Sequence, residues 1–174
     1  STLGIAIFIT YLVPPTLLFI PLSRVVSFLG LTDTIWALIL TYPTFAIPFS
    51  TWLLMGYFRT IPKELEECAM IDGATRLQAL YRIVLPVAVP GIATAGLFTF
   101  TLSWMEFIYA LSFIHQSIHR TLPVGIVADL RTGDVFFWGP LMAGALLASV
   151  PVVILYSVFT EYFVSGLTAG ATKQ

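Results

Sequence analysis

The chain has little charge. Only 10% of its 174 residues are Asp, Glu, Lys or Arg, and the formal net charge is −1. This balance provides neither a basic surface for nucleic acid nor an acidic surface for a basic partner. By contrast, 58% of the residues are hydrophobic, which is more apolar surface than the core of a domain of this length can bury. The composition therefore indicates a protein of the lipid bilayer.

Cysteine and catalytic motifs are also scarce. Cys68 is the single cysteine, which excludes an internal disulfide and, without nearby ligands, indicates no metal site. His115 and His119 lack further ligands and are expected to be solvated loop residues. The sequence contains no G-x-x-x-x-G-K-[ST] motif, so it has no phosphate-binding loop of its own. It also offers no nucleophile and base pair or metal spacing that indicates an enzyme.

Long apolar runs dominate what is present. Four uncharged runs of at least 23 residues occupy positions 1–23, 34–58, 83–105 and 135–160. A helix of that length, rising ~1.5 Å per residue, crosses a hydrocarbon layer of roughly 30 Å. The first run is not typical of a cleaved signal peptide, because no basic region precedes it and Pro14 and Pro15 interrupt it. We expect an all-α fold, a polytopic membrane helix bundle with four membrane helices visible, forming one transmembrane domain over residues 1–174.

Basic residues are concentrated in one of the three connections. The connection between the second and third runs holds Arg59, Lys63, Arg76 and Arg82. The other two connections hold only Arg24 and, after the third run, Arg120 and Arg131. Because cytoplasmic loops carry an excess of Lys and Arg, we expect the loop at about 59–85 to be cytoplasmic and the other two connections to lie outside.

The cytoplasmic loop is expected to form two helices joined by a glycine turn. Pro62 is placed for the first turn of a helix over residues 63–71. Gly73 can end this helix in the left-handed conformation, and Thr75 with Gln78 has the spacing of a capping box that opens the second helix. Four apolar residues then recur at helical spacing: Leu77, Leu80, Tyr81 and Val84.

The same loop carries a specific motif. It fits E-A-A-x-x-D-G-A, an apolar helix and P-x-x-x-P at Glu67, Ala69, Asp72, Gly73, Ala74, Ile83, Pro86 and Pro90. This pattern resembles the EAA loop of the membrane subunits of ABC importers, which also precedes the penultimate membrane segment. Two positions depart from it. Cys68 stands where the family usually has Ala, and Leu80 stands where Phe is usual.

Two further stretches resemble carbohydrate importers. The run W-M-E-F-I-Y-A-L from Trp104 to Leu111 is similar to the W-N-E-F-x-x-A-L run of sugar-importer permeases, with Met105 where Asn is common. Residues 165–171 are similar to their C-terminal tail. Since such permeases usually have six membrane helices, these four resemble the third to sixth, and the chain is then either a fragment or a form without the first two. The resemblance implies a multi-pass permease of the cytoplasmic (inner) membrane for a sugar or related polyol.

The resemblance also implies a set of partners. The chain is expected to be a non-catalytic subunit without a cofactor, driven by a cytoplasmic ABC ATPase dimer that binds ATP and Mg. A second homologous permease subunit, an extracytoplasmic solute-binding protein and membrane lipid complete the set, with no nucleic acid. ATPase coupling is assigned by the resemblance to Glu67, Cys68, Ala69, Asp72, Gly73 and Ala74. For Asp72, termination of the helix by bonding to its own backbone is the alternative.

Glu106 is the only charged residue within residues 83–114. A charge in hydrocarbon costs on the order of 2.5 to 3.5 kcal/mol on insertion scales, so this side chain is expected to face protein or water. It is either a polar contact on the sugar path or gate, or an interhelical hydrogen bond near Ser103 or Tyr109. Trp104 and Tyr109 either stack on a sugar ring or pack against helices. The alternative function is an ion-coupled secondary transporter with Glu106 as its coupling carboxylate.

Overall fold

The computed structural model describes residues 7, 13–132 and 135–160 of the chain. Its larger helices are α2 (Pro15–Phe28), α3 (Ile35–Thr41), α4 (Pro43–Phe58), α5 (Glu64–Ile71), α7 (Leu85–Trp104), α9 (Leu122–Asp129) and α10 (Trp138–Val158). The shorter helical elements are α6 (Arg76–Ala79), the π-helical turn η1 (Leu80–Val84), α8 (Ile108–Phe113) and the 3₁₀ turn η2 (Ser117–His119). A two-residue antiparallel pair joins β1 (Arg131–Thr132) to β2 (Val135–Phe136).

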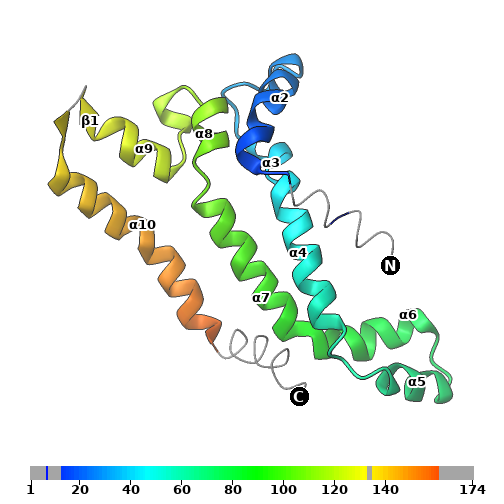
Figure 1. Cartoon of the computed structure of the whole chain (residues 1–174). Helices are drawn as coiled ribbons and strands as arrows, with labels where there is room; N and C mark the ends of the chain where they lie inside the picture. Colours follow the sequence, from blue (N-terminus) through cyan, green and yellow to red (C-terminus); the bar gives the residue numbers. More distant parts are fainter. Residues whose placement is uncertain (1–6, 8–12, 133–134, 161–174) are drawn as a thin grey trace.

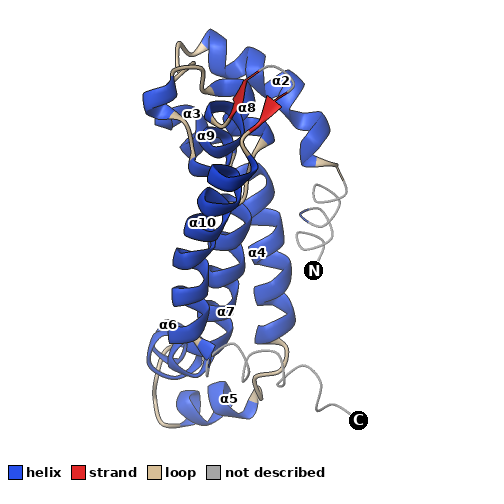
Figure 2. Cartoon of the chain, turned by 90° about the vertical axis from the view of Figure 1, so that its left-hand side faces the viewer, coloured by secondary structure: helices blue, strands red, loops and turns tan. Residues whose placement is uncertain are grey.

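The molecule is elongated, with long helices along its axis and shorter helices at its two ends (Figure 1). The helices α4, α7 and α10 run lengthwise, while α5 and α6 lie together at one end (Figure 2). At the opposite end, α2, α3, α8 and α9 gather around the tops of the long helices. The end with α5 and α6 is the one that the distribution of basic residues places in the cytoplasm.

Three helices in the described part of the chain are long and apolar enough to cross a membrane: Ile35–Phe58, Arg76–Trp104 and Trp138–Val158. They coincide with the second, third and fourth apolar runs, which confirms the prediction of a membrane helix bundle. The first part of the predicted span at 1–23, residues 1–6 and 8–12, lies outside the described residues. Its described helix, α2, has 14 residues and is only about 21 Å long at ~1.5 Å per residue. Arg24, expected in a connection, lies inside α2.

The third membrane helix begins earlier than the predicted boundary at residue 83. The elements α6, η1 and α7 form one continuous helix of 29 residues. Within it, the Leu85 N–H donates to the carbonyl of Leu80, five residues earlier, so the turn before Pro86 is wider than an α-helical turn. Pro86 has no N–H and its ring crowds the carbonyl four residues before it, which accounts for a wide turn at this point.

The helices α4 and α7, which we call the inner pair, pack against each other along their length. Gly91 permits a close approach, since a Cβ built there would overlap ring carbons of Tyr57. The rings of Phe49 and Phe98 meet edge to face with centroids 6.0 Å apart. The hydroxyls of Ser50 and Thr99 lie 2.6 Å apart and form a polar link between the two helices. The inner pair is therefore held by both shape and hydrogen bonding.

The other end of the molecule contains the main buried core. Its residues come from α2, α3, α8 and α9 and from the turn after α8: Val26, Ala37, Leu38, Tyr109, Ala110, Phe113, Ile114 and Val124. We call the helices α2, α3, α8 and α9 the outer cluster; α9 contributes Val124 to its core. Tyr109, Phe113 and Val124 are its largest fully buried side chains. The outer cluster packs as a unit because short helices from distant parts of the sequence share one apolar interior.

The chain passes between the outer cluster and the inner pair at two points, which we call the two breaks. The first, between α3 and α4 at Tyr42, is a break in hydrogen bonding only: Tyr42 keeps helical backbone angles (φ −57°, ψ −35°), but Pro43 lacks the N–H that would bond to the Ile39 carbonyl. The other lies between α7 and α8 at residues 105–107, where Met105 and Phe107 leave the α-helical conformation. The third apolar run therefore ends at a break, and a short helix of six residues, α8, follows it. Periodicity alone does not predict either feature.

The helix α10 stands apart from the rest of the bundle (Figure 1). No residue of α10 is buried in the described structure, and large apolar side chains such as Leu146 and Leu147 are 70% exposed. It contacts α9 at its outer end and touches α7 through the Trp104 indole, which donates to the Ala148 carbonyl at 3.1 Å. Such a surface is stable in lipid, where apolar side chains need no further cover.

Candidate functional site

The helix α5 is the first element of the predicted coupling loop. It covers Glu64–Ile71 and follows Lys63 at its N-cap, close to the expected helix over residues 63–71. Three acidic residues lie in its first turn: Glu64, Glu66 and Glu67. Carboxylates at a helix N-terminus interact favourably with the helix dipole, so the sequence stabilises this short helix without deep burial.

The turn after α5 confirms the prediction for Gly73. This residue has φ +87°, the left-handed conformation that glycine adopts without steric cost. The Gly73 N–H donates to the carbonyl of Met70, and the Ala74 N–H donates to the carbonyl of Ala69. These two bonds, crossing one inside the other, are those of a Schellman motif, and they close the end of α5.

The second helix of the loop opens with the predicted capping box. The Gln78 N–H donates to Thr75 Oγ1 at 3.3 Å, and the Thr75 N–H donates to Gln78 Oε1 at 2.9 Å. Ala69 of α5 and Ala79 of α6 are both buried, at 4% and 0% exposure. Small side chains at these points let the two helices approach closely, so the loop has a definite shape.

Four of the six predicted coupling residues lie on the exposed surface of the loop. Glu67, Cys68, Asp72 and Gly73 are exposed, whereas Ala74 is half-buried. Ala69 differs from the others, because its small side chain packs inside the loop rather than on its surface. The three most exposed large apolar side chains of the loop were not among the predicted coupling residues: Ile71, Leu77 and Tyr81, at 84%, 67% and 66% exposure. The helical spacing of Leu77 and Tyr81 was the sequence signal that could have identified these two residues.

Glu106 lies in the break between α7 and α8, and its carboxylate accepts three hydrogen bonds. Oε1 accepts from the backbone N–H of Tyr109 at 2.7 Å, and Oε2 accepts from the backbone N–H of Ala110 at 3.0 Å. Oε2 also accepts from the hydroxyl of Tyr42 at 3.2 Å. The interhelical bond considered from the sequence therefore exists, with Tyr42 as a partner that the sequence did not suggest. Glu106 also caps the first turn of α8.

The two aromatic candidates for the membrane path lie on either side of this break. The Trp104 ring stacks on Phe100, with centroids 5.5 Å apart and an interplanar angle of 23°. Tyr109 is 1% exposed, and its ring contacts those of Phe45 and Phe113. In this conformation, both aromatic side chains pack against protein groups.

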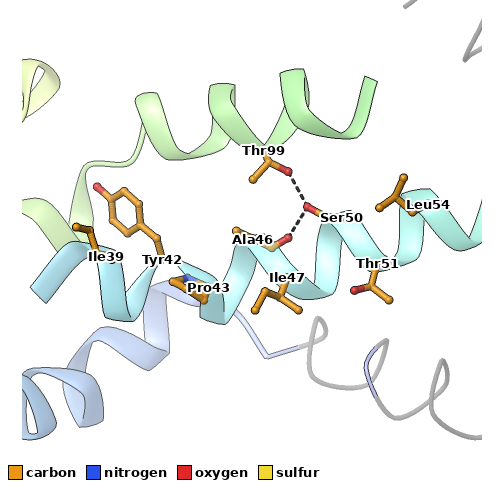
Figure 3. Close-up of a pocket in the computed structure, with 9 residues that line it drawn as sticks. All are labelled: Ile39, Tyr42, Pro43, Ala46, Ile47, Ser50, Thr51, Leu54 and Thr99. Atoms are coloured by element: carbon orange, nitrogen blue, oxygen red, sulfur yellow. Dashed lines mark hydrogen bonds between the residues drawn. The ribbon is translucent and has the colours of Figure 1, made fainter. Parts of the chain in front are cut away.

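Two hollows border the inner pair. The larger is an open groove of about 390 Å³ along α4 (Figure 3), lined by Ile39, Tyr42, Pro43, Ala46, Ile47, Ser50, Thr51, Leu54 and Thr99. The Ser50 hydroxyl is bonded there to Thr99 and to the Ala46 carbonyl (Figure 3). The smaller, of about 200 Å³, is lined by Pro15, Phe45, Leu102 and Glu106. Glu106 therefore borders open space as well as protein donors.

At the outer end, Asp33 fastens two loops together. Its Oδ1 accepts from the backbone N–H groups of His115 and Gln116, both at 2.9 Å, and its own N–H donates to the Phe113 carbonyl at 2.8 Å. The N–H of Gln116, followed by that of His115 and the charge of nearby His119, holds the pKa of the Asp33 carboxyl below its ordinary value of 3.8. Asp33 adopts φ 63°, which is uncommon for a residue with a side chain.

Comparison with known proteins gives a family match and several relatives. Residues 2–169 match the family described as binding-protein-dependent transport system inner membrane component. The inner membrane ABC transporter permease protein YcjP of Escherichia coli is 38% identical over 99% of the chain and 61% of that protein. The sulfoquinovosyl glycerol transport system permease protein SmoH of Agrobacterium fabrum is 44% identical over 92% of the chain and 56% of that protein.

A third relative comes from Thermococcus litoralis. The trehalose/maltose transport system permease protein MalG of Thermococcus litoralis is 40% identical over 87% of the chain and 55% of that protein. The chain thus spans less than two thirds of the length of each of these three relatives.

Proposed function

The chain belongs to the family of binding-protein-dependent transport system inner membrane components, and from this we propose that its protein is the permease subunit of an ABC importer. It is a multi-pass protein of the cytoplasmic membrane. The imported solute is a sugar or a related polyol, since relatives with 40 to 44% identity are permeases for trehalose or maltose and for sulfoquinovosyl glycerol. Translocation is driven by ATP hydrolysis in a partner subunit.

The coupling loop is the observation that carries this proposal. The helix α5 is closed at its C-terminal end by the turn at Gly73, projects at the cytoplasmic end of the molecule and connects directly to α4 and, through α6 and η1, to α7 (Figure 1). A rigid element in that position can transmit the closure of a cytoplasmic ATPase dimer to the inner pair as a tilt. Exposed Glu67, Cys68 and Asp72 offer polar contacts, and exposed Ile71 offers an apolar one.

The remaining partners follow from the family's mode of transport. We propose two copies of a cytoplasmic ABC ATPase, which bind ATP and Mg, and a second homologous permease subunit that completes the membrane path. An extracytoplasmic solute-binding protein delivers the solute to the outer end. The chain itself supplies no cofactor site in this scheme.

The membrane path is proposed to include Trp104, Glu106 and Tyr109. Support comes from the hollow of about 200 Å³ that Glu106 borders and from the groove of about 390 Å³ that begins nearby at Tyr42. Because the Tyr109 ring is buried and the Trp104 N–H is bonded to Ala148, contact of either ring with a solute requires a movement of the helices. Alternating access provides such a movement.

Family membership favours this function over an ion-coupled secondary transporter. The two also differ in energy source. Uptake by an ABC importer continues when the proton gradient is collapsed and ATP is intact, whereas uptake that depends on a coupling carboxylate at Glu106 stops.

Cys68 provides the direct test of coupling. It is exposed on α5, so a membrane-permeant thiol reagent is expected to label it readily in the isolated subunit. Co-expression with the partner ATPase is expected to protect it, and nucleotide is expected to change the degree of protection, because a packed protein interface excludes the reagent. The measurement is the labelling rate in membranes with and without the ATPase.

Two variants control this test. Cys68→Ser removes the single thiol and defines the background. Ser117→Cys in that background places a thiol on the exposed turn η2 at the opposite end of the molecule, where the ATPase is not expected to slow labelling. Equal labelling of Cys68 with and without a stably bound ATPase would remove the coupling role from α5.

A further inference from the structure

The two ends of the molecule form two packed units, which meet around Tyr42 and Phe45. The outer cluster shares the core formed by α2, α3, α8 and Val124, while the inner pair is held by its own contacts at Gly91 and Ser50. The covalent links between these units are the two breaks described above, at Tyr42 and at residues 105–107. Any relative movement of the units must therefore be accommodated at these breaks, since packed units move more readily as rigid bodies than by internal deformation.

Glu106 is the polar group that spans both breaks. It belongs to the break after α7, it caps α8 in the outer cluster through the N–H groups of Tyr109 and Ala110, and it accepts the hydroxyl of Tyr42 in the break before α4. An ionised carboxylate has about four acceptor sites, and three are occupied here by protein donors. The side chain is thus engaged mainly by the two breaks and only in part by the adjoining hollow.

The other contacts across this junction are less directional. Phe45 of α4 meets Tyr109 of α8 edge to face, with ring centroids 5.9 Å apart and the planes at 70°. The hydroxyls of Thr44 and Tyr109 lie 3.5 Å apart, at the limit of hydrogen bonding. Ring contacts of this kind tolerate sliding, whereas a hydrogen bond to a carboxylate requires a narrow range of distances and angles.

We propose that Glu106 is a positioning residue of the transport cycle, which sets the angle between the outer cluster and the inner pair by holding both breaks with one carboxylate. The proposal rests on the proposed transport function and deepens it. The bond from Tyr42 holds one orientation of the outer cluster, and its loss shifts the balance toward the other orientation. The cap on α8 keeps the carboxylate in place in both orientations.

The test uses the complete transporter, purified through this subunit and reconstituted in lipid. Spin labels are attached at Ile92→Cys on α7 and Ser117→Cys on η2, in a Cys68→Ser background, so that one label reports on each unit. The distance between the labels is measured without nucleotide and with ATP, Mg and vanadate. Tyr42→Phe removes the donor to Glu106 and leaves the cap on α8 intact. Glu106→Gln and the double variant complete the cycle.

The parent protein is expected to show two distance populations whose ratio changes with nucleotide. Tyr42→Phe is expected to shift that ratio by about threefold in the nucleotide-free state, the effect expected for one hydrogen bond between membrane helices. Glu106→Gln is expected to shift it in the same direction, because the charged acceptor of the Tyr42 hydroxyl is replaced by a weaker, neutral one. Since both changes act on the same bond, the shift in the double variant is expected to be smaller than the sum of the two single shifts.

The matched control is Ser112→Ala. The Ser112 hydroxyl donates to the Ile108 carbonyl within α8, so its removal breaks a hydrogen bond in the outer cluster that does not cross the junction. It is expected to leave the distance ratio unchanged. A shift equal to that of Tyr42→Phe would show a general effect of lost bonds and would overturn the proposal.

Further outcomes separate the proposal from its alternatives. A role limited to capping α8, or to binding the solute, predicts that Tyr42→Phe has no effect on the distance ratio, and that result would overturn the proposal. Additive shifts in the double variant would overturn it as well. If the complex hydrolyses ATP but the distance between the labels does not change with nucleotide, the positioning role alone is refuted. If the purified complex does not hydrolyse ATP, the proposed transport function is refuted.

Discussion

Gly73 is the residue at which backbone conformation most limits the choice of side chain. Its φ of +87° lies in the left-handed region, and a Cβ there would meet no atom within 4 Å, so any cost of substitution is conformational rather than steric crowding by neighbours. Gly73→Val is expected to strain the turn by about 1 to 2 kcal/mol and to misdirect α5. We expect solute uptake to fall while the amount of protein in the membrane is unchanged, as measured by transport assay and immunoblot.

Gly73→Asn is the matched control for this prediction, because Asn enters the left-handed region more readily than a β-branched residue. It is expected to retain more uptake than Gly73→Val. Equal uptake by Gly73→Val and the parent protein would show that the direction of α5 has no role in coupling.

Asp33 provides the charge-dependent prediction at the residue scale. Its folded pKa lies below the ordinary value of 3.8, mainly because the Gln116 N–H bonds to the charged form. A lowered folded pKa adds stability that is fully present above 3.8 and is lost as the pH falls through the folded value. Asp33→Asn is expected to lower stability at pH 7 and to flatten its decline below pH 4, as measured by unfolding midpoints of the purified protein from pH 7 to pH 3.

The pair α4 and α7 shows how one helix surface determines the approach of another. A methyl group at Gly91 would overlap the ring of Tyr57 and could not be accommodated without displacing the ring. Gly91→Ala is therefore expected to destabilise the purified protein by about 1 to 3 kcal/mol, the cost typical of overpacking. Thermal unfolding in detergent measures the effect.

Gly96→Ala is the control within the same helix, since a Cβ at Gly96 meets nothing within 4 Å. It is expected to be neutral or slightly stabilising, because alanine favours the helical conformation over glycine. If both alanine variants unfolded at the parent temperature, close packing at Gly91 would not contribute to stability.

The helices of the cytoplasmic loop were predictable because their signals are local. The left-handed turn at Gly73 and the box formed by Thr75 and Gln78 involve residues within a few positions of each other, and both occur as expected. The membrane spans were predictable for a similar reason, since length and apolar composition suffice. The roles assigned to the coupling residues stay predictions.

The junction at Glu106 was less accessible from the sequence. Glu106 was expected to find a polar partner, but Tyr42 lies 64 positions away, and only the packing of the outer cluster against α4 brings them together. The short helix α8 was missed because residues 107–114, beyond Glu106, are as apolar as α7 and show no change in periodicity. The wide turn at η1 depends on how the chain adapts to Pro86, which propensity does not specify.

Seen as a whole, the molecule has one end for each side of the membrane. Cys68 lies exposed on α5 at one end, and Ser117 lies exposed on η2 at the other. With the basic loop in the cytoplasm, a membrane-impermeant thiol reagent applied to intact cells is expected to label Ser117→Cys in a Cys68→Ser background and to spare Cys68 in the parent chain. Mass-tag gels measure the labelling.

Permeabilised cells provide the control, because the same reagent is then expected to reach both positions. Labelling of Cys68 in intact cells at the rate seen after permeabilisation would reverse the orientation. The coupling role proposed for α5 would then be untenable, since a cytoplasmic ATPase could not reach it.

The wide turn at Leu80–Val84 has a consequence for insertions and deletions in the gene. A π turn holds one residue more than an α turn, so removing one codon here would let the helix close with ordinary geometry. Because the wide turn absorbs its extra residue within one turn, such a deletion is expected to leave the direction of α5 nearly unchanged. A deletion of one codon within α7 has a different effect, since each residue of a regular α-helix contributes roughly 100° of rotation and about 1.5 Å of rise. That deletion would turn α5 away from its partner without altering any residue of its surface, so η1 is the point of this membrane helix where the chain length can change at least cost to the direction of α5.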